Sequence, residues 1–243
     1  MNLNAFNQSI RNSYETADSL GLSPRAISLV SITNAIDIRE LEDSGSYIEL
    51  YKKIVDARNL NFFFLNEDFF QFSFRGGSFR YAYYASPFVP PEDRTSDMLM
   101  DAAFGLESIQ GRADEEPTIA DEEPSIRDEE PPIPEPQIDG SGFVVRYEYT
   151  VEEYTRLTHP CAHIHLGWNK SGRLAVKRIW TPLMFAFFIF RHLHSAQWFH
   201  FVNQHHDMDG YSFDQIFKAR RHELERVNVA YFHNFEEEMV FLD

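Results

Sequence analysis

Two histidines separated by one residue, His163 and His165, have the types and spacing best suited to chemistry. Residues 162–167 alternate between apolar and polar side chains, which predicts a β-strand. Side chains alternate across a strand, so both imidazoles should project from one face, about 6.6 to 7 Å apart at the backbone. The same alternation places Cys161 on that face. Two imidazoles at this spacing can reach one phosphate group or one metal ion.

The sequence supports three interpretations of this strand. In the first, the histidines form a polar face with no chemical role. In the second, one neutral and one protonated imidazole act as base and acid on a phosphodiester, and Arg173 and Arg178 bind the phosphate. In the third, His163 and His165 bind a divalent ion such as Zn²⁺, Mn²⁺ or Mg²⁺. The candidates for the third ligand are His159, His205, His206 and Asp207.

The elements that must position these residues include several helices. Apolar periodicity and capping residues predict helices over residues 3–20, 47–58, 182–193 and 212–226. Shorter helices are expected after Ser23-Pro24 and over residues 150–157. The helix that begins at Thr181-Pro182 is apolar nearly all round, so we expect it to be buried.

Aromatic residues that alternate with polar ones predict the strands. Residues 70–75 and 79–83 form a hairpin that turns at Gly76-Gly77, and alternation resumes over 143–149, 162–167 and 173–178. Residues 229–241 could form a final strand or helix. The predicted fold class is α+β, with a single antiparallel sheet packed against helices and interrupted by a long acidic insertion.

The acidic charge of the chain is concentrated in one segment. Residues 92–139 contain 16 acidic and 3 basic residues, whereas the rest of the chain has a net charge of only −3. Three Asp-Glu-Glu-Pro units recur every seven residues, and the proline in each excludes a continuous helix. We therefore expect residues 91–140 to be a disordered insertion in one discontinuous domain, formed by residues 1–90 and 141–243. The insertion is either a tolerated surface segment or an acidic decoy that shields a basic site or docks on a basic partner.

Composition limits the class of protein. With a single cysteine, the chain cannot form an internal disulfide, so we expect a cytoplasmic protein. The longest apolar run, Leu183 to Phe190, is too short to cross a membrane. The chain lacks the motifs of dinucleotide-binding enzymes, P-loop NTPases, α/β-hydrolases and HExxH metalloproteases.

Residues His159 to Gly167, followed by Arg173, Arg178 and Thr181-Pro182, resemble an uncharacterised bacterial domain family with a His-Pro-x-x-His-x-His-x-Gly block. The paired histidines also look like those of small toxins from toxin–antitoxin modules. The resemblance to the domain family implies no settled activity, whereas the likeness to toxins implies a place near mobile or antiviral defence genes.

We therefore expect a toxin-like or antiviral-defence effector that hydrolyses nucleic-acid phosphodiesters. His163 and His165 would be the catalytic pair or metal ligands, with His159 as a further ligand and Arg173 and Arg178 as phosphate-binding residues. Such an effector would have nucleic acid as substrate and a protein partner such as an antitoxin. The alternative is a non-catalytic interaction subunit of a defence or toxin–antitoxin complex, whose acidic insertion binds a basic partner.

Overall fold

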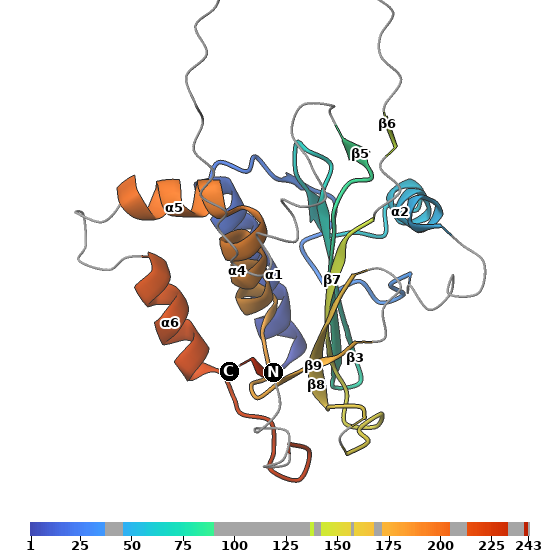
Figure 1. Cartoon of the computed structure of the whole chain (residues 1–243), viewed down its shortest axis with the longest axis vertical. Coiled ribbons are helices and arrows are strands. Elements are labelled where there is room, and N and C mark those ends of the chain that lie inside the picture. Colours follow the sequence, from blue (N-terminus) through green and yellow to red (C-terminus); the bar gives the residue numbers. More distant parts are fainter. Residues whose placement is uncertain are drawn as a thin grey trace, which may run out of the picture.

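The computed structural model describes residues 1–36, 46–89, 137–138, 142–156, 158–167, 172–204, 213–232 and 241–242 (Figure 1). Its helices are α1 (Leu3–Ser19), α2 (Tyr47–Asp56), α4 (Pro182–Leu193), α5 (Ser195–Gln204) and α6 (Phe213–Glu223). Its strands are β1 (Arg25–Ala26), β2 (Phe62–Phe63), β3 (Phe69–Arg75), β4 (Ser78–Tyr84), β5 (Phe88–Val89), β6 (Gln137–Ile138), β7 (Val144–Tyr149), β8 (Ala162–Leu166), β9 (Leu174–Val176) and β10 (Phe241–Leu242).

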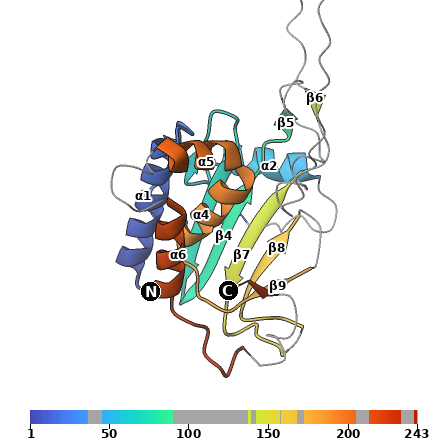
Figure 2. The same ribbon diagram turned by 60° about the vertical axis from the view of Figure 1, so that its left-hand side comes forward.

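A central sheet contains most of the strands, in the order β1-β2-β3-β4-β7-β8-β9-β10 (Figure 2). All neighbours are antiparallel except β9 and β10, which pair in parallel. Strands β4 and β7 pair directly, with Tyr84 opposite Val144, although the acidic segment separates them in sequence. The predicted α+β class is therefore confirmed, and one sheet continues across the acidic segment.

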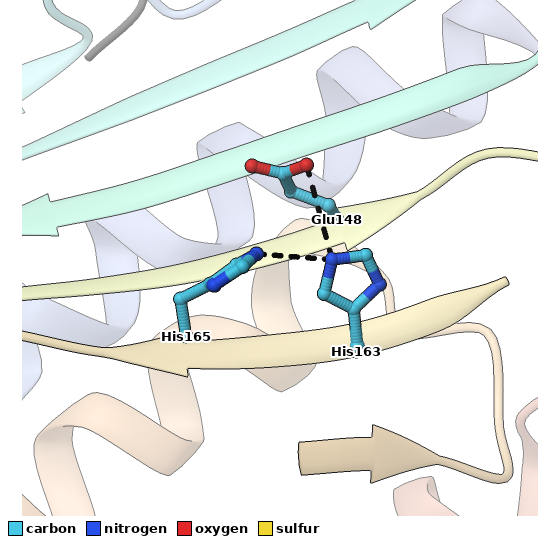
Figure 3. Close-up of side chains that lie close together, drawn as sticks. All are labelled: Glu148, His163 and His165. Atoms are coloured by element: carbon cyan, nitrogen blue, oxygen red, sulfur yellow. Dashed lines mark hydrogen bonds and ion pairs between the residues drawn. The ribbon is translucent and has the colours of Figure 1, made fainter. Parts of the chain in front are cut away.

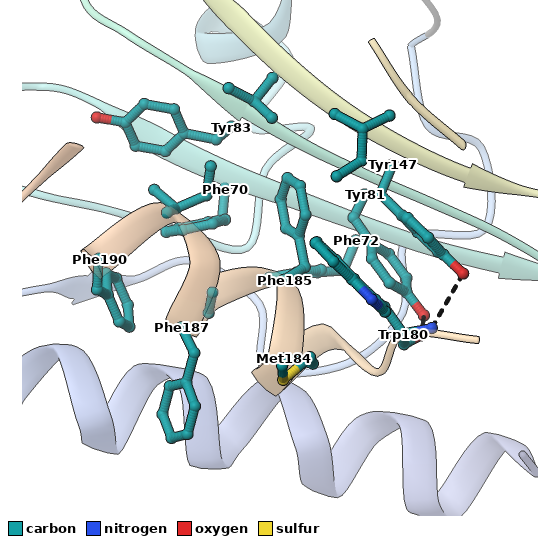
Figure 4. Packing of buried hydrophobic residues seen from close by; sticks show 14 of the residues in the cluster. Phe70, Phe72, Tyr81, Tyr83, Tyr147, Trp180, Met184, Phe185, Phe187 and Phe190 are labelled. Atoms are coloured by element: carbon teal, nitrogen blue, oxygen red, sulfur yellow. Dashed lines mark hydrogen bonds between the residues drawn. The ribbon is translucent and has the colours of Figure 1, made fainter. Parts of the chain in front are cut away.

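One face of the sheet, which we call the inner face, packs against α1 and α4 (Figure 4). Phe70, Phe72 and Tyr81 from β3 and β4 contact Phe185 of α4 with ring centroids 5.7–6.4 Å apart. Thr181 caps α4 by accepting from the Met184 amide, and Pro182 occupies its first turn. The predicted start and burial of this helix are confirmed, since most of its residues lie in the core.

The opposite, outer face has two parts. At one end, α2 covers Phe69, Tyr84 and Val144 and forms a second apolar cluster with them. The predicted capping box of α2 is present, because Ser46 accepts from the Glu49 amide and the Glu49 carboxylate accepts from the Ser46 amide. Beyond α2 the outer face is polar, with the residues Gln71, Ser73, Arg80, Arg146, Glu148, His163 and His165 on adjacent strands.

Two short helices predicted from capping residues are absent from the described chain. After Ser23-Pro24 the chain forms β1, because Arg25 and Ala26 pair with β2. Residues 150–156 form turns, and Thr155 makes an isolated bridge with His159. At the first place, pairing with the sheet outweighs the local helical signal. At the second, a turn closed by the Thr155–His159 bridge replaces the helix.

The C-terminal part differs from the prediction after α4. Helix α4 ends at Leu193 as expected, with His194 as its C-cap, and a separate helix that was not predicted, α5, begins at Ser195. Residues 241–242 form a strand.

Residues 91–136 and 139–140 of the predicted insertion lie outside the described residues, so its expected disorder stays a prediction. Within the described parts of the chain, no helix is long and apolar enough to span a membrane.

Candidate metal centre

Three ionisable side chains meet on the outer face where β7 and β8 pair (Figure 3). Glu148 of β7 lies directly opposite His163 of β8, and Arg146 lies opposite His165. Since residues opposite each other on antiparallel strands share a face, this register places a carboxylate beside two imidazoles. The shared face of His163 and His165 is thus confirmed.

The three side chains are almost completely buried. Glu148, His163 and His165 expose 3%, 0% and 4% of their surface. The Nε2 atoms of the two histidines are 3.0 Å apart, and Nε2 of His163 is 3.9 Å from Oε2 of Glu148. Burying a polar group costs free energy unless the group interacts with another group or with a ligand. Three such groups buried side by side are therefore expected to bind one another or a common ligand.

A backbone carbonyl determines which nitrogen of His163 carries the hydrogen. Nδ1 of His163 lies 2.7 Å from the Pro160 carbonyl oxygen. A carbonyl can only accept, so Nδ1 must donate, and in the neutral ring Nε2 keeps its lone pair. That lone pair faces His165 and Glu148.

Burial keeps His163 neutral. Removal from water lowers its pKa from 6.5 to about 4, even though the nearby Glu148 carboxylate and the Pro160 carbonyl favour the charged form. His159 and Arg173 contribute to the lowering by repulsion. At neutral pH this ring is therefore a lone-pair donor, as a metal ligand must be.

Arg146 holds the carboxylate from the other side. Its Nη1 atom lies 3.5 Å from Oε1 of Glu148, and both side chains are at least nine-tenths buried. The guanidinium leaves Oε2 of Glu148 directed toward the histidines. Arg146 and the Pro160 carbonyl thus orient two of the three candidate ligands, as outer-shell groups do in metal centres.

The donor set fits a divalent transition metal. One ligand atom from each of Glu148, His163 and His165 can be chosen so that all three lie within 4.8 Å of one another. Neighbouring ligands of a tetrahedral Zn²⁺ ion at bond lengths of about 2.0–2.2 Å are about 3.3–3.6 Å apart, a few tenths of an ångström more than the 3.0 Å between the two Nε2 atoms. Two nitrogens and a carboxylate oxygen suit Zn²⁺ and similar ions better than Mg²⁺, which prefers oxygen ligands.

A cavity of about 640 Å³ adjoins this cluster on the outer face. Arg146 and Glu148 form part of its wall, so the carboxylate connects the buried histidines with open space. Its other lining residues come from β3, β4, residues 33–36 and residues 150–153.

The structure separates the other residues singled out in the sequence. His159 packs edge-on against His163 at 5.0 Å, but its Nε2 atom lies 3.6 Å from Glu153. Arg173 is exposed and near enough to His163 to influence its pKa. Arg178 is buried elsewhere, where its guanidinium donates to the carbonyls of His222 and Leu224.

Cys161 does not share the histidine face. It belongs to the inner-face core and interacts with the side chain of Tyr149. The expectation was wrong because β8 begins at Ala162, so strand alternation does not extend back to the cysteine. His205, His206 and Asp207 lie outside the described residues.

Sequence reasoning missed Glu148 and Arg146 as site residues. Alternation in residues 143–149 does place both on the face opposite the aromatic side chains. The missing information was the register between β7 and β8, which are joined by a connection of 12 residues.

Comparison with known proteins gives a family but no activity. A family model described as an uncharacterized conserved protein (DUF2290) matches residues 20–234. A comparison with curated proteins and with solved structures found no match. The match covers most of the chain and confirms the expectation of a domain of unknown function. The chain belongs to the DUF2290 family of uncharacterized conserved proteins.

Proposed function

We propose that this protein is a metal-dependent hydrolase of nucleic-acid phosphodiesters, with a divalent transition-metal ion bound by Glu148, His163 and His165. The observation that carries the proposal is the meeting of these three buried side chains, from two paired strands, within 4.8 Å. The adjoining cavity supports it, because a phosphodiester can approach the Glu148 side of the cluster.

Metal binding is favoured over direct acid/base catalysis by the two histidines. A general acid must be protonated, whereas burial lowers the pKa of His163 to about 4. A catalytic base must also reach the substrate, and His163 has no exposed surface. Neither condition applies to a metal ligand, which works through the ion.

The chain's own residues would prepare the site. The Pro160 carbonyl fixes the His163 tautomer, Arg146 orients Glu148, and Arg146 adds a positive charge beside the cavity. A bound divalent ion would supply Lewis-acid activation of water and of the phosphoryl oxygens. In the overall reaction, water oxygen bonds to phosphorus, the ester P–O bond breaks, and a proton from water passes to the leaving oxygen.

The proposal is tested first by metal content and then by cleavage. The purified full chain is dialysed, loaded with Zn²⁺ or Mn²⁺, and analysed by mass spectrometry of its metal content. We expect one ion per chain, lost in the variants Glu148→Gln, His163→Gln and His165→Gln. The matched controls Glu15→Gln on α1 and His200→Gln on α5 lie at exposed positions and should bind as the wild type does.

Cleavage is followed with labelled RNA and DNA. We expect hydrolysis by the loaded wild type, abolition by a chelator, and at least a 100-fold loss in the three ligand variants. A folded wild type that binds no ion, or whose cleavage is equal in the ligand variants and the controls, would overturn the proposal.

The biological setting that fits this activity is a toxin-like or antiviral-defence effector in the cytoplasm, controlled by a protein partner such as an antitoxin. The competing role, a non-catalytic subunit, depends on the acidic segment that lies largely outside the described residues. It predicts a folded protein that cleaves nothing and loses its partner when residues 92–136 are deleted.

A further inference from the structure

The cavity beside the candidate metal centre is built from rows of residues that run across the strands. One row contains Ser73, Arg80 and Glu148 and continues to His163, and the next contains Gln71, Ala82 and Arg146 and continues to His165. Small side chains in these rows leave open space on the sheet. Large or charged side chains from the same strands border this space.

Among the residues that line the cavity, Arg146 indicates most clearly which chemical groups a ligand would carry. It is 8% exposed and lines the cavity, and its Nη1 atom faces Glu148. Its Nε atom is buried and has no hydrogen-bond partner among the described residues. A buried guanidinium N–H without an acceptor is costly, so this group is suited to an acceptor that a bound ligand would supply.

Two further arginines line the same space. Arg80 lies directly opposite Glu148 in the β4–β7 ladder, and Arg75 lies at the end of β3 beside the hairpin turn. Arg80 also approaches Glu153, with 3.6 Å between Nη2 and Oε1. Three guanidinium groups from three adjacent strands suit a phosphate, since their planar forks match its oxygens.

The acidic residues of the wall show which kind of phosphate compound would fit. Glu152 accepts from Thr150 at 3.1 Å, and Glu153 is the neighbour of Arg80 and His159. Together with Gln71 and Asn34, these carboxylates offer acceptors for hydroxyl and amino groups. A mixture of arginines and neutral or acidic acceptors matches a phosphorylated sugar with a base rather than phosphate alone.

The volume of the cavity and the net charge of the chain favour a compact ligand. A volume of about 640 Å³ is typical of small-molecule sites. Outside residues 92–139 the chain has a net charge of −3, so it lacks the excess of Lys and Arg that long nucleic-acid tracks require.

We infer that this cavity binds a nucleotide-sized phosphoester, with Arg146, Arg80 and Arg75 around its phosphate. Two sources share this chemistry: a free nucleotide and the phosphorylated end of a nucleic-acid strand. Binding itself does not depend on the proposed function. Only its consequence rests on that function: in the proposed hydrolase, the ester bond lies next to Glu148 and the strand is cut at its end.

Binding is measured by calorimetry on the metal-free full chain in chelator, with adenosine 5′-monophosphate as the probe. We expect saturable binding that weakens at least tenfold in Arg146→Gln and several-fold in Arg75→Gln. Arg75 is exposed, so this second variant should fold even if Arg146→Gln does not. Arg11→Gln, at an exposed position on α1, is the matched control and should bind unchanged.

Oligonucleotides separate the two sources. Tighter binding of a 5′- or 3′-phosphorylated oligonucleotide than of its hydroxyl-ended form, lost in Arg75→Gln, identifies a strand end. Binding of the mononucleotide alone identifies a free nucleotide. The inference is overturned if neither probe binds, if Arg75→Gln and Arg11→Gln bind equally, or if a circular oligonucleotide binds as well as a phosphorylated linear one.

The outcomes for this cavity and for the metal centre are independent. Nucleotide binding without any metal uptake would keep the inference and overturn the proposed hydrolase. Metal-dependent cleavage whose KM is the same in Arg75→Gln and Arg11→Gln would keep the hydrolase and overturn the inference.

Discussion

The inner and outer faces of the central sheet are built from the same strands, and around β7 and β8 both are buried. Tyr147 and Ile164 expose none of their surface on the inner face, and Glu148 and His163 expose 3% and 0% on the outer face. Apolar groups gain stability from burial alone, whereas buried charged groups need partners. The inner face therefore stabilises the fold, and the outer face holds the charged groups on which the proposed metal and phosphate sites depend.

The largest effect is expected from a cavity in the inner face. Phe185→Ala removes a ring that contacts Phe70, Phe72 and Tyr81, and should lower the free energy of unfolding by about 4 kcal/mol. Denaturant unfolding measures it. Ser73→Ala, on the outer face of β3, is the comparison and should change stability by less than about 0.5 kcal/mol. Equal losses in the two variants would remove the distinction between the faces.

A smaller loss of stability is expected from changes to the buried charges of the outer face. It tests whether the Arg146–Glu148 pair stabilises the fold. Arg146→Met leaves Glu148 buried without its ion-pair partner and should cost about 3 kcal/mol in the metal-free protein. The double variant Arg146→Met/Glu148→Leu should recover most of that loss in denaturant unfolding, because no buried charge is then left alone. If the double variant stays about 3 kcal/mol less stable than the wild type, the ion pair is itself stabilising and the functional explanation for it fails.

The pH dependence of stability should reveal the buried imidazole. The pKa of His163 is about 4 in the folded protein and 6.5 in the reference state, so the unfolded chain takes up the proton first as pH falls. Its contribution is complete above about pH 6.5 and is lost on acidification toward pH 4.

At pH 5 this linkage amounts to about 2 kcal/mol. Unfolding of the metal-free wild type and of His163→Gln is compared at pH 7 and pH 5, which cancels the titration of other groups. A wild type that loses no more stability than His163→Gln over this range would show that the imidazole is not held neutral.

The smallest losses of stability are expected from the N-cap residues of the helices on the two faces. Thr181 caps α4 on the inner side and Ser46 caps α2 on the outer side. Thr181→Ala and Ser46→Ala should each lower stability by about 1 kcal/mol, and Thr181→Ser should restore most of the loss at the first position. Thermal unfolding measures these changes. A loss above about 3 kcal/mol at either site would mean that the hydroxyl does more than cap a helix.

Local sequence signals predicted much of the fold. Thr181-Pro182 marks the start of α4, Ser46 and Glu49 form the expected capping box, and the turn at Gly76-Gly77 joins β3 to β4. These signals succeed because each depends on residues close in sequence. The short helices expected after Ser23-Pro24 and at residues 150–157 were wrong. Residues 25–26 pair with the distant strand β2, and Thr155 bridges to His159 in a local turn instead of starting a helix.

The candidate site was only half visible in the sequence. The spacing of His163 and His165 placed two imidazoles on one face, and the described structure agrees. Arg178, chosen as a phosphate-binding residue, instead donates to carbonyls at the C-terminal end of α6, because the chain after β9 pairs with the segment that follows α6 through the Arg178–Arg226 bridge. No local signal distinguishes it from Arg173.

Period and composition are local properties, and they were enough to predict the α+β class, the buried helix α4, the acidic segment and the paired histidines. The folded chain was needed to see that Glu148 and Arg146 join the histidines and that three arginines line one cavity. Those contacts depend on the register between strands that are distant in sequence. A shift of one residue in that register would have turned Glu148 to the opposite face of the sheet.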